Sequence, residues 1–180
     1  MSNNALLILA SGNDRPGIVD RISGLVYEAG CNLEDSRMGI LGGEFSLMVL
    51  VTGGTESLNK VRADMPSLEE ELGLFVKLKE TVAGPEARRF SPPAILCRID
   101  AVSMDQPGIV HKLSRLLAVE RVNVARLDTT RSNAPVTGTP MFSIEMDVEV
   151  PQGVLIPALR SRLQAWAELE NIDLDLRVER

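Results

Sequence analysis

The chain contains one six-residue pattern twice, and this repeat limits the fold more than any other feature of the sequence. Residues 14–19 read DRPGIV, and residues 105–110 read DQPGIV, 91 positions later. The same offset pairs Arg21 with Lys112, Ser23 with Ser114, Leu25 with Leu116 and Asn32 with Asn123. One offset held from residue 14 to residue 32 indicates a duplicated module, so we expect two similar units.

Both copies predict the same order of elements, strand–helix–strand–strand–helix–strand. The helix after each D-x-P-G turn carries apolar residues at spacings of three and four, and the Gly42-Gly43 pair is a strong hairpin signal. Strands are predicted at 6–10, 32–41, 45–51, 74–78, 95–102, from 123, at 142–148 and at 172–178, and second helices at 58–72 and 155–166. We therefore predict an α+β fold of two ferredoxin-like βαββαβ modules, each an antiparallel sheet with its helices on one face.

The division into domains follows from a proline-rich segment between the copies. We predict domains at 1–82 and 94–180 and a linker at 83–93, which contains three prolines and no periodic pattern. Pro66 falls within the predicted second helix of the first copy, and we expect it to bend or break that helix.

Charge and composition exclude several classes of function. The net charge is −6 and no basic stripe is present, which argues against direct binding to nucleic acid. No apolar run approaches the roughly 20 residues that span a bilayer, and no signal peptide is recognisable, so we expect a cytoplasmic protein without membrane contact.

The residues that usually carry catalysis are scarce. Cys31 and Cys97 lack metal-site spacing, and His111 has no recognisable nucleophile beside it. The sequence contains no phosphate-binding loop and no dinucleotide fingerprint. We therefore predict no catalytic residue, no metal site and no cofactor.

The D-x-P-G turn is the main candidate for ligand binding. The N-terminus of the helix that follows it presents free N–H groups at Gly17-Ile18 and at Gly108-Ile109, which suit a carboxylate. Asp14 and Asp105 either contact a ligand or only cap their helices. Both interpretations remain open at the level of the sequence.

Asn32 and Asn123 open the second strand of each copy, and we expect them to lie beside the turn. An amide carries donors and acceptors, so it can hold an amino acid; the alternative is that each asparagine orders the turn between helix and strand. Residues 34–37, EDSR, predict either a cross-strand salt-bridged surface or an interface or effector contact, and the run of glutamates at 69–71 predicts a solvated helix face.

These motifs resemble the ACT domain, a regulatory βαββαβ module that often binds amino acids. The resemblance rests on DRPGIV and DQPGIV, followed by GCNL at 30–33 and VNV at 122–124. The stretches GCNLEDSRM and LGGEF of the first copy are similar to the glycine cleavage system transcriptional repressor family. The first copy also resembles the N-terminal ACT domain of formyltetrahydrofolate deformylases.

The resemblance implies a function and a set of ligand residues. It implies a non-enzymatic transcriptional regulator that acts through a partner protein, a transcriptional activator, and is modulated by a small amino acid such as glycine. The alternative is an accessory ACT subunit of an amino-acid or one-carbon enzyme. The ligand positions of the family fall on Asp14, Asn32, Asp105 and Asn123. Sheet edges that need covering allow a homodimer.

Overall fold

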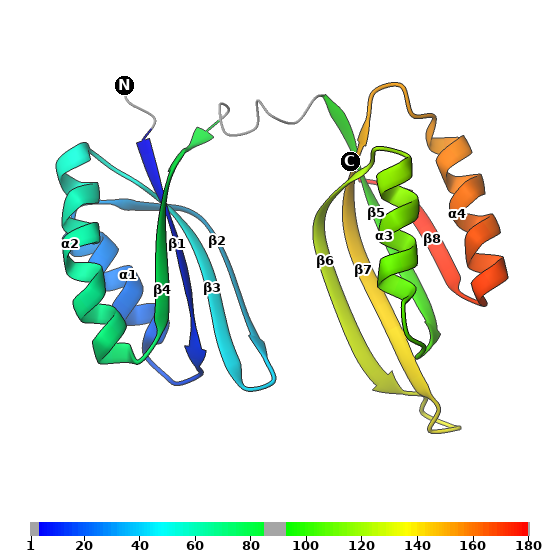
Figure 1. Ribbon diagram of the computed structural model, residues 1–180, viewed down its shortest axis with the longest axis horizontal. Helices are drawn as coiled ribbons and strands as arrows, with labels where there is room; N and C mark the ends of the chain where they lie inside the picture. The colour runs from blue at the N-terminus through cyan, green and yellow to red at the C-terminus, as the bar shows by residue number, and fades with distance from the viewer. Residues whose placement is uncertain (1–3, 85–92, 180) are drawn as a thin grey trace. The chain divides into compact units, whose positions relative to one another are not determined.

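The computed structural model describes residues 4–84 and 93–179, and the chain divides into two compact units, residues 1–90 and 91–180. Most of the predicted linker, residues 85–92, lies outside the described residues. Figure 1 shows one βαββαβ module in each unit. None of the helices in the described residues is long and apolar enough to cross a membrane.

The first module contains four strands and two helices in the predicted order. Its elements are β1 (Asn4–Asn13), α1 (Ile18–Glu28), β2 (Asn32–Leu41), β3 (Glu44–Thr52), α2 (Thr55–Leu72) and β4 (Phe75–Val82). The strand order in the sheet is β2-β3-β1-β4, and all neighbours are antiparallel. Both helices lie on the same face of this sheet (Figure 1).

The second module repeats this arrangement. Its elements are β5 (Ala94–Met104), α3 (Ile109–Val119), β6 (Asn123–Asn133), β7 (Pro140–Pro151), α4 (Ile156–Glu170) and β8 (Asp173–Val178). The strand order is β6-β7-β5-β8, again antiparallel throughout. The predicted fold class is therefore confirmed.

The core of each module lies between the sheet and its helices. Alternate residues of β1, Leu6, Ile8 and Ala10, are buried against α1 and α2, because successive side chains of a strand point to opposite faces. In the second module Cys97, Ile99 and Ala101 of β5 take the same places against α3 and α4. Each module thus has its own core.

A β-bulge occurs at the same position in both modules. The register between β2 and β3 shifts between Leu33 and Asp35, and the register between β6 and β7 shifts between Val124 and Arg126. After the bulge, Asp35 and Arg37 share the face away from the helices, and their side chains form an ion pair of 2.6 Å between Oδ1 and Nη1. An ion pair therefore lies on this surface, but it joins two residues of one strand, whereas the expectation was a pair across strands.

Two expectations about the helices differ from the structure. The helix α2 continues through Pro66, so the expected break does not occur. The helix α4 begins at Ile156, so Leu155 lies outside it and is exposed, while Ala167 joins the core. The strands β6 and β7 continue to the turn between them, where backbone hydrogen bonds join Ala134 to Thr139 and to Gly138.

We predict that Pro66→Ala stabilises the protein. Pro66 is exposed in the helix interior, where it lacks an N–H for the carbonyl of the preceding turn. Removing this defect should raise the free energy of unfolding by about 1–2 kcal/mol, after allowance for the greater freedom of the unfolded chain. Urea unfolding checks this, with Ser67→Ala as the control that reports helix propensity alone. Equal gains in both variants would contradict the prediction.

Candidate functional site

The turn between β1 and α1 is built around a glycine in the left-handed conformation. Gly17 is the N-cap of α1 with φ 95°, and Gly108 is the N-cap of α3 with φ 88°. Neither helix start receives a hydrogen bond from a capping side chain. The interpretation that Asp14 and Asp105 cap their helices is therefore wrong.

The space in front of each turn is open. A Cβ atom added at Gly17 or at Gly108 would meet no atom within 4 Å. Glycine is thus needed at both positions for its positive φ rather than for packing within the module. The first N–H groups of α1, from Ile18 onward, receive no hydrogen bond from a capping side chain.

The second residue of the D-x-P-G motif ties the turn to the end of the other helix. In the first module, Arg15 Nη2 donates a hydrogen bond of 2.9 Å to the backbone carbonyl of Glu71, in the last turn of α2. In the second module, Gln106 Nε2 donates one of 3.2 Å to the backbone carbonyl of Glu170, the last residue of α4. Carbonyls at a helix C-terminus lack intrahelical partners, so each contact satisfies one of them.

The same glutamates also bind a cation on the first helix of their module. Arg21 donates from Nε and Nη2 to the two carboxylate oxygens of Glu71, at 2.8 and 2.5 Å. In the second module, Lys112 Nζ donates to both oxygens of Glu170, at 2.8 and 2.7 Å. We call each set the helix clamp: Arg15, Arg21 and Glu71 in the first module and Gln106, Lys112 and Glu170 in the second.

The clamp changes the ionisation of its members in the first module. The hydrogen bonds from Arg21 hold the pKa of the Glu71 carboxyl below its ordinary value. The Glu71 carboxylate in turn raises the pKa of Arg21, first through the hydrogen bonds and then through its charge. Both side chains are about half exposed, so salt screens this pair.

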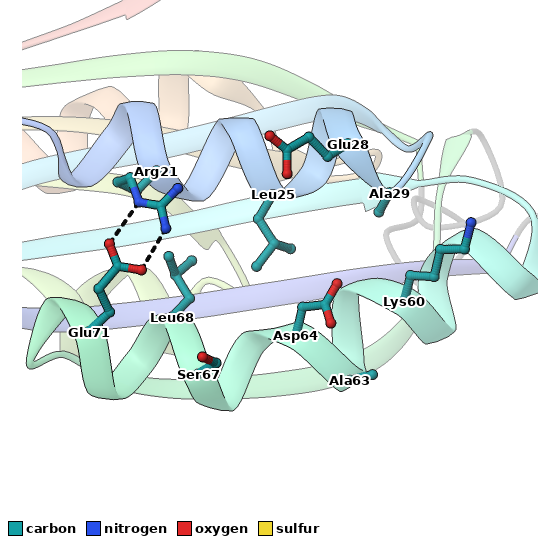
Figure 2. A pocket seen from close by; sticks show the side chains of 10 residues that line it. All are labelled: Arg21, Leu25, Glu28, Ala29, Lys60, Ala63, Asp64, Ser67, Leu68 and Glu71. Carbon is teal, nitrogen blue, oxygen red and sulfur yellow. Dashed lines mark hydrogen bonds and ion pairs between the residues drawn. The ribbon is translucent and has the colours of Figure 1, made fainter.

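A groove runs between the two helices beside the clamp. In the first module it encloses about 480 Å³, and Figure 2 shows Arg21 and Glu71 joined across its end. The charged residues that line it are Arg21, Glu28, Lys60, Asp64 and Glu71. The groove of the second module encloses about 410 Å³ and is lined by Trp166, Leu116 and Val119 in addition to charged side chains. None of the predicted ligand residues lines either groove.

Asn32 and Asn123 do not lie beside the turn, contrary to expectation. Asn32 pairs with Thr52, which also pairs with Ala5 at the start of β1, whereas the turn follows the other end of β1. Eight strand residues separate these levels, or about 26 Å at roughly 3.3 Å per residue. The second module has the same arrangement. One module therefore cannot present both the turn and its asparagine to a single amino acid.

The motif residues of the second module are engaged in internal contacts. Asp105 binds Arg131 at 2.9 Å, and the amide of Asn123 donates to a carboxylate oxygen of Glu149 at 2.9 Å. In the first module, Ile40 occupies the place of Arg131, and Thr52 occupies that of Glu149. Within the described residues, the side chains of Asp14 and Asn32 make no such contact.

Sequence reasoning missed the helix clamp. The repeat offset does pair Arg15 with Gln106 and Arg21 with Lys112, so conserved hydrogen-bonding capacity after the duplication was a usable signal. Glu71 was concealed in the run of glutamates that predicted a solvated face. Glu70 and Glu71 are exposed, as predicted, although Glu71 also binds Arg21. Glu69 is partly buried, and its carboxylate accepts a hydrogen bond of 3.0 Å from the backbone N–H of Val76.

Groups that could perform chemistry are not gathered in the described residues. No cluster of three or more histidine, cysteine or acidic side chains there could hold a metal ion. Cys97 is fully buried, and burial raises the pKa of its thiol and also that of Cys31. Burial therefore disfavours the thiolate form that a nucleophile requires.

Parts of the sequence are similar to known proteins. The family model for the ACT domain matches residues 4–79. The chain is 34% identical over 126 residues to the glycine cleavage system transcriptional repressor of Escherichia coli (strain K12). This alignment covers 70% of this chain and 64% of that protein. It is also 35% identical over 72 residues to UPF0237 protein MK1213 of Methanopyrus kandleri, covering 39% of this chain and 80% of that protein.

Solved structures resemble the chain over nearly its whole length. The crystal structure of a putative glycine cleavage system transcriptional repressor superposes with a TM-score of 0.72 at 25% identity, covering 98% of each chain. An unknown protein from Galdieria sulphuraria superposes with a TM-score of 0.78 at 25% identity, covering 98% of this chain and 99% of that one.

We predict that the helix clamp makes stability depend on pH in acid. Because the pKa of Glu71 is lower in the folded than in the unfolded chain, its contribution is complete above the ordinary glutamate pKa of about 4.3 and falls as the pH drops through the folded value. Glu71→Gln should therefore lower the free energy of unfolding at neutral pH, and the deficit should shrink in acid. Unfolding by urea between pH 7 and pH 3 measures it.

The neighbouring exposed residue provides the control for this prediction. Glu70→Gln removes the same charge from the same helix turn without touching Arg21. A deficit that is equal for both variants, or that stays constant with pH for Glu71→Gln, would contradict a specific role of the clamp.

Proposed function

We propose a regulatory role for this chain because it is a tandem ACT-domain protein that resembles the glycine cleavage system transcriptional repressors. In this proposal it is not an enzyme. It binds a partner protein, a transcriptional activator, and a small amino acid such as glycine modulates that binding. A protein with this role would work in the cytoplasm, where its partner and effector are found.

The similarity along the whole chain is the observation that carries the proposal. Both modules align with the putative repressor of known structure, so a repressor-like protein accounts for the second module as well as the first. The aligned part of the chain spans 64% of the length of the curated repressor.

The effector site that we propose is the β1–α1 turn of the first module. An amino acid would place its carboxylate at the free N–H groups that follow Gly17, beginning with Ile18, where the helix dipole favours an anion. The Asp14 carboxylate would repel that group, so it should bind the ammonium group instead. The open space in front of Gly17 leaves room for this ligand.

The first module is preferred because its motif residues are available. Asp105 and Asn123 are already held by Arg131 and Glu149, so a ligand at Gly108-Ile109 would have to break an existing ion pair. Asp14 has no ion pair among the described residues to give up. A ligand at the first turn therefore binds without the free-energy cost of breaking an ion pair, which a ligand at the second turn would have to meet.

Asn32 cannot assist within its own module. It lies about 26 Å along the sheet from the turn, so an effector that contacts Asn32 and a D-x-P-G turn together would need one of the two from outside the module. We therefore propose Asp14, Gly17 and Ile18 as the primary contacts.

The helix clamp offers a route from the effector to the partner. Arg15 lies next to Asp14 in the sequence and bonds the C-terminal turn of α2. A ligand that shifts the turn would shift this contact, and with it the position of α2 relative to α1. We propose that the partner senses this change on the helical face of the first module.

The alternative role is that of an accessory subunit of an amino-acid or one-carbon enzyme. It predicts a stable complex with a catalytic chain rather than with a transcriptional activator. The acidic net charge of −6 is compatible with either protein partner and disfavours direct binding to DNA. The resemblance to the repressor over both modules favours the regulator.

We predict that one or a few small amino acids, glycine among them, bind the purified chain, and that Asp14→Asn weakens this binding. Loss of a hydrogen bond to a charged group costs roughly 1.5–3 kcal/mol, so Kd should rise about tenfold or more. Isothermal titration calorimetry against the twenty amino acids measures it.

The second module supplies the matched control. Asp105→Asn alters the same motif position where the carboxylate is already paired, and it should leave Kd unchanged. A ligand whose affinity falls with Asp105→Asn and not with Asp14→Asn would place the site in the second module. If none of the twenty amino acids binds the full chain at millimolar concentration, modulation by an amino acid is wrong.

A further inference from the structure

The open face of the sheet differs in kind between the two modules. In the first, the four central residues on the face away from the helices form the cross-strand pairs Leu7–Leu50 and Leu9–Met48. The same register positions in the second module are occupied by the pairs Arg98–Asp147 and Asp100–Glu145. Every apolar residue of this central block is thus replaced by a charged one.

The charged face of the second module is satisfied in water. Arg98 binds Glu145 at 2.5 Å and Asp100 at 3.3 Å, and Arg126 binds Asp128 at 2.6 Å. This shows that the fold needs no apolar residues at the centre of its open face, although Leu96 and Val102 of β5 remain apolar on either side of the charged block. The apolar block of the first module therefore has to be explained by something other than the stability of the sheet.

The apolar block is accessible in the first module. Met48 is 46% exposed and Phe75, at the corner of the same face, is 68% exposed, while Leu7, Leu9 and Leu50 are partly buried. The position of Phe75 is occupied by Asp173 in the second module. Contiguous apolar residues on an open sheet face are typical of an interaction surface.

We propose that this face of the first module binds the same face of a second copy of the chain, so that two sheets pack in a symmetric sandwich. The inference is independent of the proposed effector and partner. The two-fold axis would run parallel to the strands, between β1 and β3. It would place β2 of one copy over β4 of the other.

The rows of residues across the sheet are self-complementary about this axis. One row ends in Asp35 on β2 and Lys79 on β4, so the axis brings opposite charges together twice. Another ends in Gly39 and Phe75, so the most exposed aromatic ring of the face would lie over a residue without a side chain.

The row between them ends in Arg37 and Lys77, which are both positive. The Asp35 carboxylate is shared between Arg37 of its own copy and Lys79 of the other, so it offsets only part of the positive charge at this rim. The centre of the sandwich would contain Leu7 over Leu50 and Leu9 over Met48. Apolar residues thus fill the middle of the interface, and charges lie at its rim.

The area of the face is sufficient for a weak dimer. Four strands spaced about 4.8 Å apart and about eight residues long cover roughly 500 Å² per copy. About 1,000 Å² in total is the lower limit for a specific interface. We therefore expect dissociation in the micromolar range rather than a permanent dimer.

Sedimentation equilibrium of the full chain tests this proposal. The wild type should change from its 19.6 kDa monomer to a dimer as its concentration rises through the micromolar range. Met48→Glu inserts the residue that the second module carries at this position, Glu145, and should weaken the dimer on the order of 100-fold, because each dimer buries two new charges. A wild type that stays monomeric at millimolar concentration would overturn the proposal.

A second variant tests the geometry without risk to the fold. A Cβ atom at Gly39 would meet nothing within 4 Å, and the backbone there is not left-handed, so Gly39→Phe should fold. It adds apolar surface, yet it should abolish the dimer by colliding with Phe75 of the second copy. Adding Phe75→Ala should restore dimerisation.

The matched control is Thr130→Phe at the equivalent position of the second module, which should leave the dimer unchanged. Thermal unfolding of each variant shows that it is folded. A dimer that survives both Gly39→Phe and Met48→Glu in folded protein would place the contact elsewhere and overturn the proposal.

Discussion

Each sheet of this protein can bury only one of its faces, because both helices of a βαββαβ module pack on the same side. The surface properties of each module therefore depend on which residues occupy the other face of its sheet. In the second module, ion pairs between neighbouring strands make that face compatible with water. In the first, the equivalent positions are apolar and nothing within the module covers them. After the duplication, the two modules therefore kept the same fold, while the residues on their open faces became different.

The helix clamp shows which contacts the duplication preserved. A donor in the turn, a cation on the first helix and a glutamate at the end of the second recur in both modules, although Arg15 has become Gln106 and Arg21 has become Lys112. The glutamates are one position apart in the aligned helices, because Glu71 is two residues before its C-cap and Glu170 is directly before its own. The chemistry that survives is a hydrogen bond to a helix-end carbonyl and an ion pair. This contact fixes the turn that offers the free N–H groups of α1. It thus joins the candidate site to the packing of the helices.

Much of the fold could be predicted, because the alternation of apolar and polar residues in strands and the helical periodicity occur in both copies. The assignment of an element in one copy therefore supports the assignment of the same element in the other copy. The candidate site was harder to predict. Asn32 follows α1 closely in the sequence, but a helix carries the chain back along the sheet, so β2 starts at the far end from the turn. Glu71 could not be singled out, because the ends of α2 and α4 align at an offset of 98, which pairs Glu71 with Leu169 and not with Glu170, and because three adjacent glutamates compete. The continuous α2 shows that packing of Met65 and Leu68 outweighs the missing bond at Pro66.

The bulge after Leu33 and after Val124 records the history of the chain. A one-residue insertion in one strand of a hairpin moves every later side chain to the opposite face, so it is tolerated only when the whole strand has adapted to it. Two independent insertions at the same place are hard to explain. The bulge therefore belonged to the single ancestral module before it was copied. The substitutions that made one open face apolar and the other ionic came afterwards, in strands whose register was already settled.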